Sequence, residues 1–236
     1  MTPRIVNLFL SLFAAGILFC ACTTQPPQVG TPIDPYAAFR ESRPRSILVM
    51  PPVNQSPDVK GPTTFLATST WPLAESGYYV IPVSLSSQMF IQNGVTVAEE
   101  AHSIAPSRLR EIFGADSALY ITITRYGVRY VGVSSIVEAA ASARLVDLRN
   151  GLELWSERIA LSESSNNRSE NFLDIVISAA LYQIINTVSD RAYDIGKQAN
   201  HQLLSAGRYK GLLYGPYHSK HLWPSARKRG NGGNSP

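Results

Sequence analysis

The sequence has few of the residues on which catalysis and metal binding usually depend. It contains two cysteines, Cys20 and Cys22, among 236 residues. Because both lie near the start, the rest of the chain lacks a thiol for a disulfide, for thiol catalysis or for a cysteine-based metal site. Gly-x-Ser-x-Gly, Walker, Gly-x-Gly-x-x-Gly and His-Glu-x-x-His motifs are also absent. The usual sequence support for serine hydrolysis, nucleotide binding and zinc proteolysis is therefore missing.

Histidine is equally scarce, with four in the chain. His102 follows Glu99 and Glu100, but no second cluster supplies further metal ligands or a catalytic partner, so we interpret it as part of a solvated loop. His218 and His221 lie three residues apart and would hold a metal only weakly. We predict no metal, no cofactor and no catalytic residue, although serine, histidine and aspartate brought together by the fold stay an open alternative.

Positive charge is concentrated at the C-terminal end. Residues 207–236 carry six cations and no acid, whereas residues 22–206 carry 14 cations and 17 acids. A nucleic-acid-binding domain needs a cationic face on its folded part to neutralise phosphates. The mildly acidic body therefore predicts that the protein does not bind nucleic acid.

The first residues have the features of a bacterial secretion signal. One cation, Arg4, precedes an apolar run over 5–19 that is too short for a comfortable membrane span. Ala21 before Cys22 is similar to a lipobox, in which the cysteine is acylated and becomes the first residue. We predict a signal peptide over 1–21 and lipidation of Cys22; an ordinary cleaved signal is the alternative.

A proline-rich tether is predicted over 22–45. It has little apolar periodicity, which is typical of an extended linker. From residue 23 it would reach roughly 75 Å at about 3.3 Å per residue. Its prolines are Pro26, Pro27, Pro32, Pro35 and Pro44.

A β-sheet is the strongest structural prediction. Residues 119–124 and 137–145 alternate apolar and polar side chains, the period of a half-buried strand. Asn150-Gly151 between two alternating runs predicts a type I′ turn, which needs positive φ at both central residues. We therefore expect a long antiparallel hairpin over 136–161.

The remaining elements predict a single domain over 46–206. The apolar run 46–50 indicates a buried central strand, and 78–83 a second strand that ends at Pro82 or lies at an edge. Helices are expected from Gly61-Pro62, interrupted at Trp71-Pro72, and over 84–93 and 106–113. The fold class is α/β: one α/β sandwich with a mixed sheet, a long antiparallel hairpin and a long C-terminal helix.

The C-terminal helix is expected to begin at Ser169. Leu173, Ile177 and Leu181 begin an apolar stripe that continues to Ala199, and a second stripe runs over 172–185. Either the helix lies deep against the sheet, or one of its two stripes faces a second copy of the protein. We predict the second arrangement, a homodimer. The basic, aromatic tail over 207–236 is expected to be largely flexible, either touching anionic lipids or serving only as a solubilising segment.

Two candidate binding sites follow from the predicted strands. The polar loop after the first strand lies where open α/β sheets tend to bind ligands; its candidate residues are Asn54, Gln55, Ser56, Asp58 and Lys60. The hairpin offers a possible recognition edge formed by Asp147, Asn150, Gly151 and Trp155. The alternative is structural, with Trp155 in the core and Asp147 hydrogen-bonded near the turn.

Four short sequence segments resemble those of a known protein family. Residues 50–57, 72–80, 112–116 and 145–155 resemble, in order, bacterial outer-membrane lipoproteins of unknown function that include a meningococcal surface-antigen candidate. The likeness covers about 45–206. More remotely, the hairpin resembles those of the TolB amino-terminal module and the curli-secretion lipoprotein, which work by holding partners. No catalytic residue is implied.

Residues and resemblance together predict a function. We expect a membrane-anchored, non-enzymatic envelope lipoprotein that binds another envelope protein as an accessory in outer-membrane assembly or secretion. Its location would be the outer membrane, lipid-anchored through Cys22 on the periplasmic side. The alternatives are an envelope hydrolase and a carrier of a small ligand or lipid.

Overall fold

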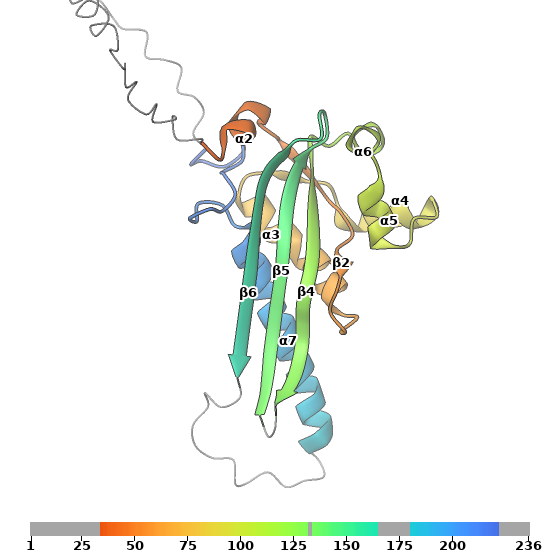
Figure 1. The fold of residues 1–236 in the computed structure, drawn as a ribbon, viewed down its shortest axis with the longest axis vertical. Helices are drawn as coiled ribbons and strands as arrows, with labels where there is room; N and C mark the ends of the chain where they lie inside the picture. Colours follow the sequence, from red (N-terminus) through yellow and green to blue (C-terminus); the bar gives the residue numbers. More distant parts are fainter. Residues whose placement is uncertain (1–33, 132–133, 165–179, 222–236) are drawn as a thin grey trace, which may run out of the picture. The chain divides into compact units, whose positions relative to one another are not determined.

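A computed structural model describes residues 34–131, 134–164 and 180–221, with 131, 134, 164 and 180–190 described by their backbone alone (Figure 1). The strands are β1 (Ser46–Val49), β2 (Val53–Asn54), β3 (Tyr79–Val80), β4 (Ser117–Val131), β5 (Ser134–Asp147) and β6 (Glu153–Ser164). The helices are α2 (Ala37–Ser42), α3 (Gly61–Glu75), α4 (Val83–Gln92), α5 (Ala98–Ser103), α6 (Pro106–Phe113) and α7 (Ala180–Leu204).

The strands form one mixed sheet in the order β3-β1-β4-β5-β6, with β2 also paired to β4. β1 pairs in parallel with β3 and β4, whereas β4-β5 and β5-β6 are antiparallel. The predicted mixed sheet and long hairpin are confirmed. β3 lies at the edge of the described sheet, as Pro82 predicts, because proline cannot donate to a neighbouring strand.

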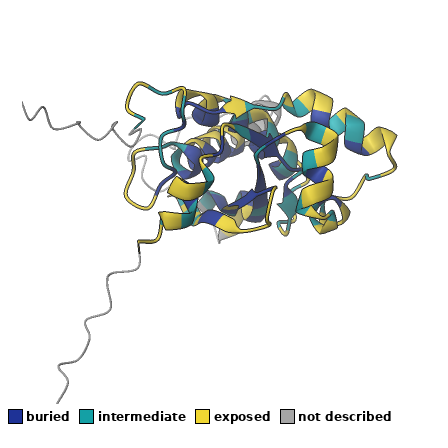
Figure 2. Ribbon diagram, turned by 90° about the horizontal axis from the view of Figure 1, so that it is seen from above, coloured by how far each residue is buried: buried dark blue, intermediate teal, exposed yellow. Residues whose placement is uncertain are grey.

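Helices cover the sheet unequally on its two faces. Side chains of α2, α3 and α7 pack on the face that carries Leu119, Ile121 and Ile123. Side chains of α4, α5 and α6 pack on the opposite face, but only over β1 and the start of β4, around Leu48 and Tyr120. Figure 2 shows the buried residues on the central strands and the exposed ones on the outer sides of the helices. Most of the opposite face of β4-β5-β6 therefore has no helix over it among the described residues.

Small residues let α7 approach the sheet closely. Gly196 of α7 faces Tyr126 of β4, and a Cβ at Gly196 would lie 2.6 Å from the Tyr126 ring. The row Ala139, Ala141 and Ala143 on β5 is buried on the same face. Any larger residue at Gly196 would push the helix outward, because real Cβ atoms do not approach other atoms this closely.

Several local predictions are wrong. α3 continues through Pro72 instead of breaking there, because this proline lies in the last turn. Its missing N–H then costs one intrahelical bond near an end where the helix is already weakest. Residues 98–103 form α5, so His102 is helical and partly buried instead of lying in a solvated loop.

The hairpin turn also differs from the predicted type I′ turn. Gly151 has φ +75°, but Asn150 does not adopt positive φ. The loop is closed by bonds from Asp147 N to Leu152 O and from Gly151 N to Asp147 O, both 2.9 Å. It is therefore a longer loop in which glycine alone occupies the left-handed region.

Both ends of the folded unit extend beyond the predicted 46–206. α2 lies inside the predicted tether, yet its Phe39 is buried in the core, so the contacts that form the unit begin at Tyr36. At the other end, Leu212 of the predicted tail is buried in the same core. The remaining predicted tail, 222–236, and the signal peptide lie outside the described residues.

The Asp147 carboxylate ties α2 to the hairpin loop. It is fully buried, accepts a hydrogen bond from Ser42 Oγ at 2.7 Å, and forms an ion pair with Arg149. Arg149 also donates to Ser42 O at 2.7 Å. Burial, the largest influence, raises the pKa of Asp147, but the bonds from Arg149 and Ser42 outweigh it and lower the pKa to about 2.

We predict that Asp147→Asn removes an acid-sensitive part of the stability. The unfolded carboxyl titrates near 3.8, so Asp147 contributes its stability above that pH and loses it as pH falls towards 2. The variant should be about 2 kcal/mol less stable at pH 7 and nearly equal to the parent at about pH 2, measured by urea unfolding. Asp194→Asn, at an exposed position on α7, is the control. An equal loss at both pH values would contradict the prediction.

Asn200 joins α7 to α3 inside the core. Its Nδ2 lies 2.8 Å from Phe65 O, 2.8 Å from Thr68 Oγ1 and 3.1 Å from Ser69 Oγ. The two hydroxyls donate to helix carbonyls of α3. A carboxylate at this position would therefore face acceptors and hydroxyls whose protons are already in use.

We predict that Asn200→Asp destabilises the fold by more than about 3 kcal/mol, because it buries an unpaired charge. Gln198→Glu adds the same charge at an exposed position two residues away and should change stability by less than about 0.5 kcal/mol. Urea unfolding of both variants measures the difference. Similar unfolding midpoints for the two variants would show that the buried hydrogen bonds of Asn200 do not hold α7 to α3.

Candidate functional site

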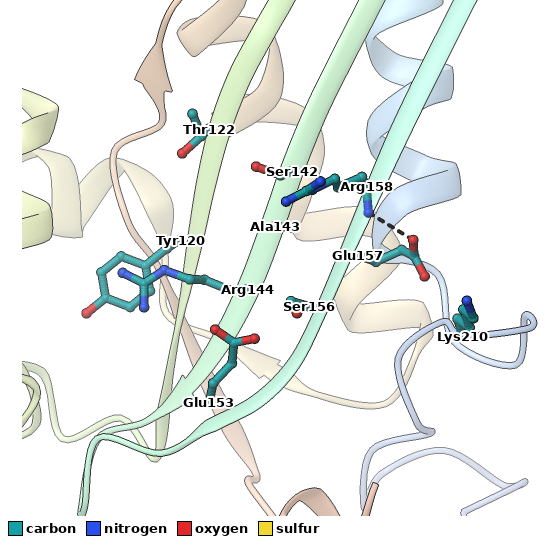
Figure 3. Close-up of a pocket in the computed structure, with 10 residues that line it drawn as sticks. All are labelled: Tyr120, Thr122, Ser142, Ala143, Arg144, Glu153, Ser156, Glu157, Arg158 and Lys210. Carbon is teal, nitrogen blue, oxygen red and sulfur yellow. Dashed lines mark hydrogen bonds between the residues drawn. The ribbon is translucent and has the colours of Figure 1, made fainter. Parts of the chain in front are cut away.

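An open hollow of about 500 Å³ lies on the uncovered face of β4-β5-β6 (Figure 3). Its lining residues come from all three strands and from the segment after α7. They are Tyr120, Thr122, Ser142, Ala143, Arg144, Glu153, Ser156, Glu157, Arg158 and Lys210. Strand pairing aligns several of these residues across the sheet, because Tyr120 lies opposite Arg144, and Ser142 opposite both Thr122 and Arg158.

The guanidinium group of Arg144 lies over an aromatic ring. Its guanidinium carbon lies 4.2 Å from the centroid of the Tyr120 ring, a cation–π contact. Behind Tyr120, the His102 ring packs edge-on with centroids 5.0 Å apart, and His102 Nε2 lies 2.8 Å from Pro51 O. Helix α5, which the sequence prediction missed, thus supports the wall of the hollow.

The two rings behind Arg144 are shifted towards their neutral forms. Burial lowers the pKa of His102; the hydrogen bond to the Pro51 carbonyl opposes this, and the nearby Arg144 charge adds to it. Burial also raises the pKa of Tyr120. Both rings therefore favour their uncharged states at neutral pH, so the formal positive charge at this wall comes from Arg144.

The hollow combines guanidinium groups with small hydroxyl side chains. Neither Arg144 nor Arg158 forms an ion pair within the described part of the chain. Ser142 and Ser156 leave room around them, while Glu153 and Glu157 lie at the β6 side. Guanidinium groups beside hydroxyls are donors suited to carboxylates or other planar anions.

The lining residues offer little for hydrolysis. Two serines are present, but no imidazole lines the hollow to act as their base. Across the described residues, no group of three or more His, Cys, Asp or Glu side chains is placed to hold a metal ion. The guanidinium and hydroxyl groups of the lining are chemically suited to hydrogen-bonding an acidic or polar group.

The loop predicted as a first binding site is closed by its own hydrogen bonds. Asn54 Nδ2 donates to Asp58 O, and Asn54 Oδ1 accepts from Ser56 N and Oγ. Asp58 Oδ1 accepts from Lys60 N at 2.8 Å. The loop follows β2, on the side of β4 away from β5, so the structure does not bring it to the hollow.

The predicted recognition hairpin is divided between inside and outside. Asp147 and Trp155 are buried, and Trp155 Nε1 donates to Lys210 O at 2.8 Å, as the structural alternative describes. Asn150 and Gly151 are exposed. Asp147 and Asn150 line a second hollow of about 350 Å³ beside α2.

Other predicted features fall partly or wholly outside the described residues. Cys22 does, as do Leu173 and Ile177 of the long helix. Within α7, the stripe residues Ala192, Ile195 and Ala199 pack in the core, so this part of the stripe does not face a second copy. None of the described helices combines the length and apolarity needed to cross a bilayer.

The sequence prediction did not select Arg144 or Arg158. The signal was available, because the alternation over 137–145 puts Arg144 and Ser142 on the polar face. The antiparallel pairing then sets Arg158 opposite Ser142. What the pattern did not show is that no described helix covers this face.

Comparisons with known proteins place the chain in a family. A family model described as "Putative lipoprotein GNA1162-like" matches residues 34–217. The lipoprotein NMB1124/NMB1162 of Neisseria meningitidis serogroup B is 44% identical over 216 residues, which is 92% of this chain and 96% of that protein.

Two solved structures are similar to this chain to different degrees. The crystal structure of lipoprotein GNA1162 from Neisseria meningitidis matches with a TM-score of 0.51 and 48% identity, over 61% of this chain and 99% of that one. The C-terminal domain of LpoB from Salmonella enterica matches with a TM-score of 0.38 and 18% identity, over 50% of this chain and 82% of that one. From the family model and the meningococcal relative, we conclude that the chain belongs to the GNA1162-like lipoprotein family.

Proposed function

We propose that this protein is a non-enzymatic accessory of the bacterial envelope, anchored by a lipid on Cys22 to the periplasmic side of the outer membrane. In this proposal, it binds an acidic segment of another envelope protein on the uncovered face of β4-β5-β6. Membership of a lipoprotein family supports the membrane anchor. The observation that carries the binding role is the hollow with two guanidinium groups that have no carboxylate partner among the described residues.

The β6 edge supports binding of an extended segment. Among the described strands, β6 (Glu153–Ser164) pairs only with β5, so no described strand lies along its other edge. A partner strand added there would pair its backbone with β6 and bring its side chains beside Arg158 and Ser156. Acidic side chains would then complement Arg144, Arg158 and Lys210.

Neither alternative function gains a specific observation. A hydrolase would require a base beside Ser142 or Ser156, and no histidine lines the hollow. A lipid or small-ligand carrier would require a tunnel lined by residues 61–94 and by the long C-terminal helix, and no residue of 61–94 or of α7 lines either of the two hollows.

The first prediction concerns the anchor. Cells fed an alkyne-labelled palmitate should incorporate the label into the parent protein and into Cys20→Ser, but not into Cys22→Ser, because only the second variant removes the acylated thiol. In-gel fluorescence of the immunoprecipitated chains measures the label. Labelling of Cys22→Ser equal to that of the parent would exclude Cys22 as the lipid site.

The second prediction concerns the binding face. A photo-crosslinking amino acid at Ser156, which is exposed on β6, should crosslink in intact cells to a segment rich in Asp and Glu. Adding Arg158→Glu should reduce that adduct about tenfold or more, which corresponds to about 1.4 kcal/mol of binding. The yield is measured by mass spectrometry of the crosslinked peptide.

Lys197→Glu on α7 makes the same charge reversal at an exposed position away from the hollow and should leave the adduct unchanged. A crosslinked peptide without acidic residues, or an adduct indifferent to Arg158→Glu, would contradict the proposal. An adduct of twice the chain mass would identify the partner as a second copy and replace the hetero-partner with a homodimer.

A further inference from the structure

The segment after α7 lies along the folded unit as a strap, which we define as residues 206–221. Gly215 N donates to Ser76 O at 2.7 Å, and Tyr217 N donates to Gly77 O at 3.1 Å. Tyr78 OH donates to Leu213 O at 2.6 Å from the edge of the sheet. Gly211, Leu212 and Gly215 are buried. The strap is therefore fixed to the end of α3 and to the residues before β3.

The outer side of the strap is aromatic and cationic. Tyr209 is 92% exposed and Tyr217 is 68% exposed, which is unusual for such large rings on a fixed segment. Arg208, Lys210 and Lys220 are also exposed, and residues 206–221 contain no acid. Lys210 Nζ lies 5.6 Å from the centroid of the Tyr209 ring.

This surface lies beside the point where the membrane tether joins the folded unit. Tyr36, the first residue of that unit, donates its hydroxyl proton to Gly211 O of the strap at 2.7 Å. Figure 1 shows α2 next to the segment that follows α7. Because 36–45 are folded, the tether shortens to 23–35, whose greatest reach is about 45 Å.

The long strands β4, β5 and β6 form a ribbon whose other end, near Val131, lies far from Tyr36, where the folded unit begins. β4 runs from Ser117 to Val131, and 14 residue steps of about 3.3 Å separate its ends by about 46 Å. The loop between β5 and β6, near Ser117 and Asp147, is tied to α2 by Asp147 and Arg149. The strap is therefore at the end of the ribbon where the tether is attached.

We propose that the strap lies on anionic phospholipid head groups of the membrane that holds the lipid anchor. Tyrosine is favoured at membrane interfaces, where its ring is apolar and its hydroxyl stays hydrated. Lys and Arg beside it are attracted to anionic lipids over roughly a Debye length. Membrane contact by the strap is separate from the proposed partner binding. It depends on the proposed lipid anchor only because the anchor brings the strap near the bilayer.

The test uses the lipidated full chain in vesicles. In that chain the signal peptide with Cys20 is removed and Cys22 is acylated, so no free thiol is left. Ser219→Cys in the strap and Ser162→Cys on β6 then each introduce a single site for an environment-sensitive fluorophore. Both serines are exposed, which makes the pair matched. Lipids with a spin label near the head group quench a fluorophore that touches the membrane.

The label at 219 should be quenched several-fold more than the label at 162 in vesicles containing phosphatidylglycerol. The excess should disappear in phosphatidylcholine vesicles, in the Arg208→Glu/Lys220→Glu background, and between about 0.1 M and 1 M NaCl, over which the Debye length falls from about 10 Å to 3 Å. Flotation of the vesicles reports the lipid anchor separately.

Equal quenching at the two positions, with the chain still floating with the vesicles, would overturn the strap proposal and leave the anchor intact. Quenching at 219 that is independent of lipid charge and salt would also overturn it, because the cations would then have no role. If the cysteine at position 219 is shielded in cells but not in vesicles, the strap contacts a protein. That result would overturn the proposed membrane contact.

Discussion

The packing of α7 on the inner row of β5 is the contact on which the rest of the structure depends. Ala139, Ala141 and Ala143 are small enough for the helix to lie close to the sheet, and Gly196 removes the Cβ that would meet Tyr126. Because side chains alternate along a strand, fixing the inner row also fixes Ser142 and Arg144 on the outer face. The same register therefore forms the core and the hollow.

A second set of contacts joins the segments at one end of the sheet. Asp147 and Arg149 connect the hairpin loop to Ser42 of α2, and Trp155 connects β6 to the strap through Lys210 O. These hydrogen bonds involve buried or charged groups, whose loss costs more than that of an exposed neutral pair. Two residues of the predicted recognition hairpin, Asp147 and Trp155, thus stabilise the end of the fold to which the tether is attached.

The sequence predicted those features that depend on local periodicity. The alternation over 119–124 and 137–145 identified β4 and β5, and the positive φ of Gly151 agrees with the predicted turn residue. Features set by tertiary contacts were missed: α5 is short, and α2 follows a proline-rich stretch but is held by burial of Phe39. A bulge at Ile123/Arg125 resets the alternation so that Tyr126 returns to the core, and no local pattern reveals it.

The hollow and the strap lie next to each other at the tether end of the ribbon, because Lys210 of the strap also lines the hollow, and this gives the proposed anchor a role beyond attachment. A partner bound along β6 would meet a ribbon whose one end is fixed near Tyr36, while a tether of 13 residues limits how far that end can move from the bilayer. Tethering raises the effective concentration of a binding site for partners held within its reach. If the strap also rests on the head groups, the ribbon has a defined orientation, so Arg144 and Arg158 would face partners at a restricted height above the membrane.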